Sequence, residues 1–157
     1  MSGEETRPSI DSWVMELVSV VGKRSTCRRH KIGAIMVRDK RILTTGYNGA
    51  PSGLSDCLEL GCLRDELEIP SGSRQEICRA IHAEQNAILQ GAIHGVSLVG
   101  ATLYCTHNPC RICAKMIINA GVVRVVFEQS YDDASFEDLF EVAGVIWEQK
   151  FAQGELQ

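Results

Sequence analysis

The sequence of 157 residues contains no apolar run that approaches the ~20 residues needed to cross a lipid bilayer. Its first residues are polar and acidic, unlike the basic and apolar start of a secretory signal peptide. We therefore expect no membrane partner and a cytoplasmic location. Seven cysteines in such a reducing compartment favour metal ligands and buried thiols over disulfides.

The chain also lacks an excess of positive charge. Its 16 lysines and arginines are outnumbered by 20 acidic residues, which gives a formal net charge of −4 and a pI of about 5.6. Because proteins that bind nucleic acid usually carry a basic face, we expect no nucleic-acid partner. A basic cluster over residues 23–31 is the local exception, and it fits either a solvated helix end or the capture of a small phosphate group.

No internal repeat or low-complexity tract divides the sequence. A chain of this length with 45% hydrophobic residues is expected to fold as a single domain over residues 1–157, burying roughly two-thirds of its unfolded surface. Residues 1–8 are expected to form a loose tail. Residues 48–75 are rich in Gly, Pro and Ser, and are predicted to form a long loop of the kind that is usually functional or tied down.

Hydrophobic spacing predicts helices and strands that alternate after an opening hairpin. Ser9 is a plausible N-cap for the first helix, and Asp39-Lys40 is a plausible hairpin turn. The predicted helices cover 10–24, 79–92, 110–120 and 133–143, and the predicted strands cover 32–38, 42–47, 102–106, 122–128 and, at an edge, 145–147. This order predicts an α/β sandwich with a mixed sheet.

Three residues of the types that bind Zn²⁺ stand out, namely His82 and the pair Cys110 and Cys113. Three ligands are one fewer than a closed structural site needs, so the fourth position is free for water, as in a catalytic site. The two cysteines are three residues apart at the start of a predicted helix, where the helix dipole favours the thiolate. Glu84 lies two residues from the histidine, close enough to handle the proton of that water.

Zn²⁺ lowers the pKa of bound water toward ~7, and the resulting nucleophile can attack an amidine-like carbon such as C4 of cytosine. Glu84 would take the water proton and deliver it to the ring nitrogen and the departing amine. The competing interpretation is a structural zinc with an incidental glutamate, in which Cys105 or His107 would supply the fourth ligand.

Three segments carry a family resemblance over about residues 12–145: RSTCRRHKIGAIMVRDKRILTTGYNGAPSG, AIHAEQNAILQGA and TLYCTHNPCRICAKMIINAG. They contain the H-x-E…P-C-x-x-C signature of zinc nucleobase deaminases. The chain resembles the cytidine and deoxycytidylate deaminase superfamily, specifically the deoxycytidylate (dCMP) deaminases. The resemblance implies a three-layer α/β/α sandwich with a mixed five-stranded sheet. It also implies deamination of dCMP to dUMP and ammonia, a step that feeds thymidylate synthesis.

The resemblance assigns roles to the residues that match the family's motifs. It implies a catalytic zinc held by His82, Cys110 and Cys113, and a proton shuttle at Glu84. The implied substrate contacts are Asn48 for the sugar, the backbone N–H of Ala83 for O2 of the base, and Arg24, Ser25 and Thr26 for the 5′-phosphate.

The resemblance further implies a homo-oligomer, commonly a hexamer, that dCTP activates and dTTP inhibits. The effector would bind around Gly46, Tyr47, Asn48 and Gly49. Taken alone, these glycines indicate only a permissive turn, and no Walker-type lysine follows them.

Four other cysteines gather around the long loop, at Cys27, Cys57, Cys62 and Cys78. A closed zinc site of four thiolates would explain how the loop stays ordered, because metal binding offsets the ordering entropy. Some dCMP deaminases carry a second, structural zinc nearby, often with a histidine where this chain has Asp56. The alternative is four unrelated reduced thiols.

Other functions share the zinc chemistry. The substrate could be cytidine, dCTP or a tRNA adenosine, although the acidic stretch over residues 131–149 would repel a polynucleotide. A different class would be a non-catalytic, zinc-stabilised nucleotide-binding protein. The presence of Glu84 argues against that class, because such a protein needs no proton shuttle.

Overall fold

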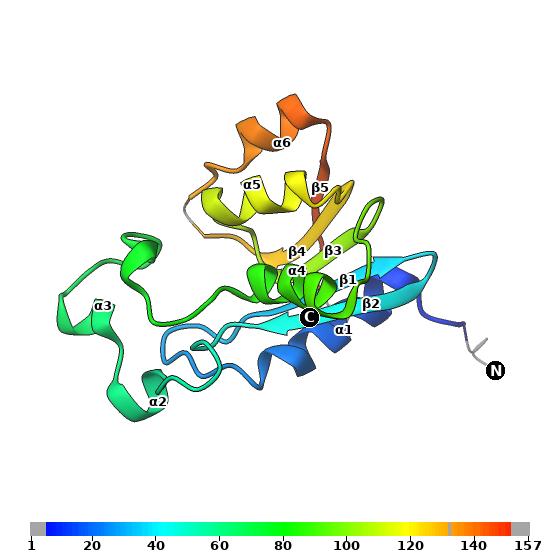
Figure 1. Ribbon diagram of the computed structural model, residues 1–157. Helices are drawn as coiled ribbons and strands as arrows, with labels where there is room; N and C mark the ends of the chain where they lie inside the picture. The colour runs from blue at the N-terminus through cyan, green and yellow to red at the C-terminus, as the bar shows by residue number, and fades with distance from the viewer. Residues whose placement is uncertain (1–5, 132, 152–157) are drawn as a thin grey trace, which may run out of the picture.

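The computed structural model describes residues 6–131 and 133–151, and its centre is a mixed five-stranded sheet of order β2-β1-β3-β4-β5 (Figure 1). The strands are β1 (Gly33–Arg38), β2 (Arg41–Tyr47), β3 (Thr102–His107), β4 (Arg124–Gln129) and β5 (Ile146–Gln149). β1 is antiparallel to both β2 and β3, whereas β3, β4 and β5 run parallel. The predicted edge strand is confirmed as β5.

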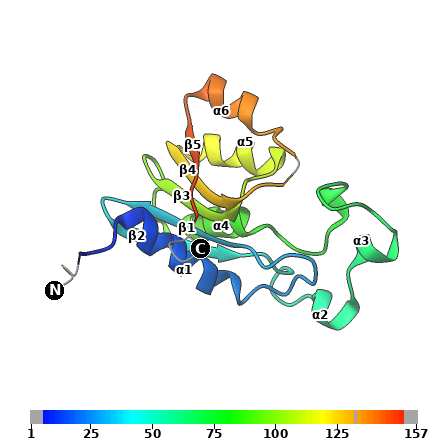
Figure 2. The same cartoon turned by 180° about the vertical axis from the view of Figure 1, so that it is seen from behind.

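Helices cover both faces of the sheet, which confirms the predicted three-layer sandwich. α1 (Ile10–Gly22) lies on one face, and α4 (Ala83–His94), α5 (Arg111–Asn119) and α6 (Glu137–Ala143) lie on the other (Figures 1 and 2). Within the described residues, no helix combines the length and the apolar character that a bilayer span requires. The predicted tail over 1–8 falls mostly outside the described residues, and residues 6–8 have no regular structure.

The alternation of β1 side chains builds one core on each side of the sheet. Ile35 packs with Val14 and Val18 of α1, while Met36 belongs to the larger cluster beneath α4, α5 and α6. All four side chains are almost completely buried. The sheet therefore holds α4 and α5 side by side on one face, where their N-terminal ends can form a common site.

Close packing between β2 and α4 depends on Gly46. A Cβ atom at this position would lie 2.2 Å from the backbone oxygen of Ala83 and 2.5 Å from the nitrogen of Ala87. Only glycine lets the start of α4 approach the strand this closely. Gly46 thus has a packing role that its sequence context did not reveal.

The segment over residues 48–82 is more structured than the predicted loop. It contains two one-turn helices, α2 (Cys57–Leu60) and α3 (Leu63–Glu66), and the 3₁₀ turn η1 (Gln75–Ile77). Asp56 caps α2, because its Oδ1 accepts a hydrogen bond of 2.8 Å from the backbone N–H of Leu58. Figure 1 shows the segment extending to the side of the sheet. Arg29 holds the segment against the rest of the chain through two hydrogen bonds. Its Nε donates to Oδ1 of Asp65 at 2.6 Å, and its Nη2 donates to the Ile69 oxygen at 2.7 Å.

Two helices begin four residues later than predicted. α4 starts at Ala83 and not at residue 79, because His82 has extended backbone angles and acts as the N-cap. The backbone N–H of His82 donates to Oε1 of Gln85 at 3.0 Å, which fixes this boundary. His82 therefore lies just before α4, and not within its first turn. α6 also starts later, at Glu137, four residues after its predicted start.

Candidate active site

The three predicted zinc ligands meet where α4 and α5 begin. β3 leads through Pro109 to Cys110, the N-cap of α5, whose Sγ accepts the backbone N–H of Cys113 at 3.4 Å. His82 has the equivalent N-cap position on α4. Both helix N-termini thus face one point, and their unpaired N–H groups and dipoles favour negative ligands there.

The distances between the ligand atoms fit a zinc ion. Nδ1 of His82 lies 3.5 Å from Sγ of Cys110 and 3.3 Å from Sγ of Cys113, and all three atoms lie within 4.8 Å of one another. Tetrahedral zinc with Zn–S of ~2.3 Å and Zn–N of ~2.0 Å places nitrogen and sulfur about 3.5 Å apart. No other group of this kind occurs among the residues that the structure describes.

Neither alternative fourth ligand belongs to this group. Cys105 is completely buried in β3, and His107 stacks on Tyr131 at a ring-centroid distance of 4.8 Å. The three-ligand arrangement therefore leaves a position for water, as a catalytic site requires.

Glu84 is positioned to handle protons beside the ligands. Only 4% of it is exposed, and its Oε2 lies 3.9 Å from Sγ of Cys113. Burial raises the pKa of Glu84 to about 7, although the charge of His82 acts in the opposite direction. A carboxyl group with such a pKa can both accept and release a proton near neutral pH.

The pKa values of the three ligand side chains are shifted in different directions. A hydrogen bond from Cys113 lowers the pKa of Cys110 to about 4, and the same bond raises the pKa of Cys113. Burial disfavours a charged His82, yet the hydrogen bond to Cys110 and the charge of Glu84 raise the pKa of His82 overall. At least one thiolate is thus favoured at the site, and thiolate is the form that binds metal.

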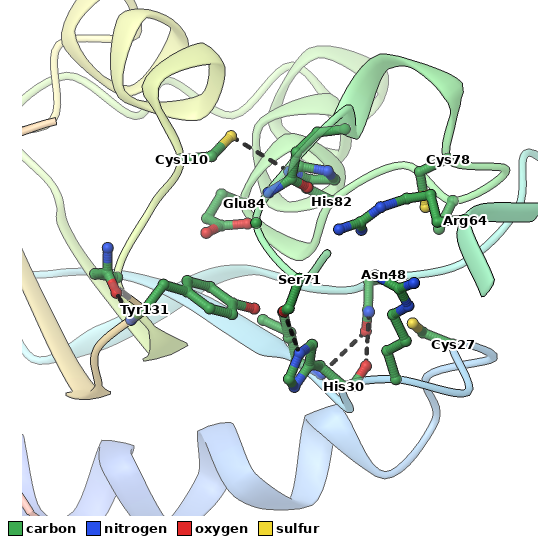
Figure 3. Close-up of a pocket in the computed structure, with 16 residues that line it drawn as sticks. Cys27, His30, Asn48, Arg64, Ser71, Cys78, His82, Glu84, Cys110 and Tyr131 are labelled. Atoms are coloured by element: carbon green, nitrogen blue, oxygen red, sulfur yellow. Dashed lines mark hydrogen bonds between the residues drawn. The ribbon is translucent and has the colours of Figure 1, made fainter. Parts of the chain in front are cut away.

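A pocket opens beside these residues, and several of its walls come from the long segment and from the chain after β4 (Figure 3). His82, Glu84 and Cys110 lie at one end. The other residues that line it include Cys27, Arg29, His30, Asn48, Arg64, Ser71, Gln75, Cys78, Asn108 and Tyr131.

Two arginines in the pocket have buried N–H groups without a partner among the described residues. Arg64 is only 7% exposed, and its Nη2 donates to the Pro70 oxygen at 3.3 Å while its Nε has no partner. Nη1 of Arg29 is also buried and unpaired. Burial, together with the charges of Arg29 and Arg64, lowers the pKa of His30. Because an unsatisfied buried donor costs about 1–3 kcal/mol, an acceptor that reached these groups would stabilise them.

The predicted phosphate residues do not line this pocket. Arg24 is exposed, and Ser25 uses its hydroxyl oxygen to accept the backbone N–H of Cys27 at 3.1 Å. The backbone N–H of Thr26 donates to the Asn48 oxygen at 3.2 Å. Ser25 and Thr26 shape the turn that carries Arg29, so their contribution to the pocket is indirect.

Asn48 does line the pocket, but both ends of its side chain already bind the backbone. Its Nδ2 donates to the His30 oxygen at 2.9 Å, and its Oδ1 accepts the N–H of Ile32 at 3.0 Å. Its contact with a sugar stays a prediction. The same holds for Ala83, the first residue of α4, whose N–H has no partner inside the helix.

The segment 46–49 is bound firmly to the start of α4. The Tyr47 oxygen accepts Nδ2 of Asn86 at 2.8 Å, and Gly49 exchanges backbone hydrogen bonds of 3.2 and 2.8 Å with Ile81. These contacts give the segment a structural role. Effector binding at Gly46, Tyr47, Asn48 and Gly49 stays a prediction.

The four remaining cysteines lie near one another, but not at ligand distances. Burial raises the pKa of Cys57, and the nearby Cys78, Cys27 and Cys62 raise it further. Among the described residues, however, no three of these sulfur atoms lie within 4.8 Å of one another. The second zinc site therefore stays a prediction.

Sequence reasoning missed Arg64, Tyr131 and Asn108 as pocket residues. No spacing or motif assigned them a role: Arg64 lies in the one-turn helix α3, Tyr131 lies in the chain after β4, and Asn108 lies just before Pro109. The one available signal was the position of Arg64 inside the long loop that was predicted to be functional.

The fold and the ligand group together define a metal-assisted hydrolytic site, with an open three-ligand position and a buried carboxyl group beside it. The sequence model of one protein family, the cytidine and deoxycytidylate deaminase zinc-binding region, matches residues 8–129. The chain therefore belongs to this family of zinc-binding deaminases.

Individual relatives agree with this assignment. The deoxycytidylate deaminase of Schizosaccharomyces pombe is 40% identical over 142 residues, which cover 88% of this chain and 43% of that protein. The deoxycytidylate deaminase of Mycobacterium phage D29 is 38% identical over 78% of this chain and 96% of its own length. The chain thus spans less than half of the yeast relative but matches almost all of the phage protein.

A solved structure is similar over nearly the full length of the chain. The dCMP deaminase from the cyanophage S-TIM5, in complex with dCMP and dUMP, is 34% identical with a TM-score of 0.75. The match covers 93% of this chain and 100% of that structure. The two proteins therefore share the same overall fold.

Proposed function

We propose that this chain catalyses the hydrolytic deamination of dCMP to dUMP and ammonia. The observation that carries the proposal is one pocket with His82 and Cys110 of the three-ligand group and buried Glu84 at one end, and two arginines with buried, unpaired N–H groups elsewhere in its lining. The similarity to deoxycytidylate deaminases, one of them solved with dCMP and dUMP, supports the same substrate.

Glu84 is the residue that moves protons in this proposal. Zinc, when bound by His82, Cys110 and Cys113, would supply the Lewis acid that activates water for attack. In the proposed reaction Glu84 accepts one proton from the water that adds to C4 and delivers it to the ring nitrogen next to C4. It then takes the remaining proton from the oxygen now bound to C4 and gives it to the amino group, so that the C4–N bond breaks, ammonia leaves and the C4 carbonyl of dUMP forms. Its burial keeps the carboxyl group out of bulk water and raises its pKa toward neutrality, which suits both directions of transfer.

The substrate's phosphate is proposed to bind Arg64 and Arg29. Their unpaired buried N–H groups would gain an acceptor, and guanidinium groups bind phosphate strongly. This assignment is an alternative to the prediction for Arg24, Ser25 and Thr26, which lie outside the lining. The backbone N–H of Ala83 and the side chain of Asn48 are proposed to hold the base and the sugar.

A homo-oligomer and regulation by dCTP and dTTP are also proposed. Several large apolar side chains are more than half exposed, which supports burial against further copies of the chain: Ile93 (68%), Val142 (91%) and Ile146 (61%). Light scattering on a size-exclusion column measures the mass of the assembly. A monomer at micromolar concentration would overturn this part of the proposal.

The substrate is tested by ammonia release from the zinc-loaded protein with dCMP, CMP, deoxycytidine and dCTP, each with and without dCTP or dTTP as effector. We expect dCMP to be turned over well above the others. Deoxycytidine turned over as well as dCMP would contradict the role of the arginines. Activity on none of the four would contradict the proposed substrate and direct the search to adenine or guanine compounds.

A further inference from the structure

One wall of the pocket is formed by irregular chain after β4. Residues 130, 131 and 133 have no regular secondary structure, yet Tyr131 lines the same pocket as the zinc ligands His82 and Cys110. In Figure 3 the Tyr131 ring points into the pocket, between Glu84 and His30. A side chain on irregular backbone holds such a position only if other residues fix it.

Asn108 supplies the hydrogen bonds that fix this segment. Its backbone N–H donates to the Gln129 oxygen at 3.0 Å. Its side-chain Oδ1 accepts the backbone N–H of Tyr131 at 2.5 Å, and its Nδ2 donates to the Asp133 oxygen at 3.0 Å. Asn108 is only 2% exposed, so these bonds are shielded from competing water.

The ring of Tyr131 is then held by two further rings. It stacks on His107 with 4.8 Å between centroids and 26° between planes, and it meets His30 edge-on at 5.5 Å and 80°. Nε2 of His30 in turn lies 3.1 Å from Oγ of Ser71. The wall therefore joins the end of β3, the chain after β4, the 23–32 turn and the long segment.

We propose that Asn108 is a positioning residue, which holds Tyr131 as a fixed aromatic wall for the nucleoside part of the substrate. The proposal rests on the proposed function. Asn108 also precedes Pro109 and Cys110, so it could act on the metal ligands instead. Its side chain, however, makes both of its hydrogen bonds to residues 131 and 133, and none of the structure's hydrogen bonds links that side chain to described residues 109–113.

A double-mutant cycle tests this distinction, with Asn108→Ala, Tyr131→Leu and the two combined. We expect Asn108→Ala to raise KM for dCMP about tenfold, as the loss of such hydrogen bonds suggests, while kcat changes less and bound zinc is unchanged. The combined variant should have nearly the KM of Tyr131→Leu alone, because Asn108 acts through that ring. Asn119→Ala, the same change at the exposed end of α5, is the control.

Two measurements keep the test decisive. Asn108→Asp keeps the acceptor for the Tyr131 N–H and should restore part of the KM loss; it also serves if Asn108→Ala does not fold. Hydrogen exchange should rise in residues 129–133 of Asn108→Ala but not in 109–113, whatever the substrate of the enzyme is. Wild-type protein inactive on dCMP would refute the proposed function without affecting this exchange result.

Three results would overturn the proposal. Additive effects of Asn108→Ala and Tyr131→Leu on KM would show that the two residues act separately. Loss of zinc from Asn108→Ala, or faster exchange in residues 109–113, would place its action on the metal ligands. An unchanged KM in Tyr131→Leu would mean that the ring is not part of the substrate's binding site.

Discussion

The zinc-ligand end of the pocket and its arginine-lined part are encoded in different ways. The ligands come from two short motifs, each at the start of a helix, and local rules of capping and spacing place them. Arg64 and Arg29 reach the pocket through contacts between distant segments, such as the ion pair of Arg29 with Asp65. Local sequence thus positions the residues for the chemistry, whereas the proposed substrate recognition depends on how the long segment folds back over the pocket.

The largest effect is expected at the zinc-ligand end. Glu84→Gln removes the proton shuttle but keeps the size and shape of the buried side chain, so turnover of dCMP should fall by at least about 10³-fold. Zinc content, measured by atomic absorption, should be unchanged because Glu84 is not a ligand. A variant that keeps its rate would refute the assigned role of Glu84.

The next effect tests the arginine-lined part. Arg64→Gln removes a buried charge that is proposed to bind phosphate, so KM for dCMP should rise about 10- to 100-fold, the loss expected for a hydrogen bond to a charged group. The rate with deoxycytidine should fall far less, because that substrate has no phosphate.

Arg24→Gln is the matched control for this change, since Arg24 is exposed and lies outside the pocket lining. We expect its KM for dCMP to stay within about twofold of the wild type. If Arg24→Gln caused the larger rise, the phosphate would bind where the sequence first suggested.

A smaller effect is expected at the four cysteines beside the long segment. If they bind a structural zinc, the wild type contains two zinc ions per chain, and Cys57→Ser contains one and melts at a lower temperature. Metal analysis and thermal unfolding measure both quantities. One zinc per wild-type chain would show that these cysteines are free thiols, and that hydrogen bonds alone order the segment.

The smallest effect concerns the ion pair that ties α1 to the sheet, far from the pocket. Asp11 binds Arg124 at 2.7 Å and also contacts Lys150 and the hydroxyl of Tyr104. The hydrogen bond from Arg124 lowers the pKa of Asp11 well below its usual range, although burial acts in the opposite direction. The pair therefore stabilises the fold above about pH 4, and this contribution is lost as the pH falls through the folded-state pKa of Asp11.

Asp11→Asn should lower the free energy of unfolding at pH 7 by about 1 kcal/mol, since solvent screens a partly exposed pair. Urea unfolding at pH 7 and at pH 3 measures this, and the difference between wild type and variant should shrink at the lower pH. A constant difference would mean that the charge of Asp11 is not the cause. Activity should not depend on this pair.

Much of the fold could be predicted because it follows from local patterns. The β1–β2 hairpin forms as predicted, with Asp39 and Lys40 in the left-handed turn, and the alternating elements give the expected sheet. Helix starts were harder to predict, because a cap such as Gln85 on the His82 backbone depends on side-chain geometry. The one-turn helices α2 and α3 are too short for any periodic signal.

The site residues likewise divide into those that local sequence predicts and those whose positions depend on contacts between distant segments. Residue types, spacing and the family resemblance predicted His82, Cys110 and Cys113 as zinc ligands and Glu84 as the proton shuttle, and the structure brings the three ligands together. The predicted phosphate residues do not line the pocket, because the 23–32 turn brings Arg29 to its lining and leaves Arg24 exposed. Their contact with a phosphate stays a prediction. Arg64 could not be found, since its position depends on 48–82 folding over the pocket.

The central claim is that the zinc-ligand end and the two arginines act on one nucleotide. A crystal structure of zinc-loaded Glu84→Gln soaked with dCMP tests this claim most directly, because the variant should bind the substrate without converting it. We predict the amine-bearing ring carbon next to the zinc and residue 84, with the phosphate on Arg64 and Arg29. Phosphate bound at Arg24, or a base that lies away from the zinc, would contradict the account.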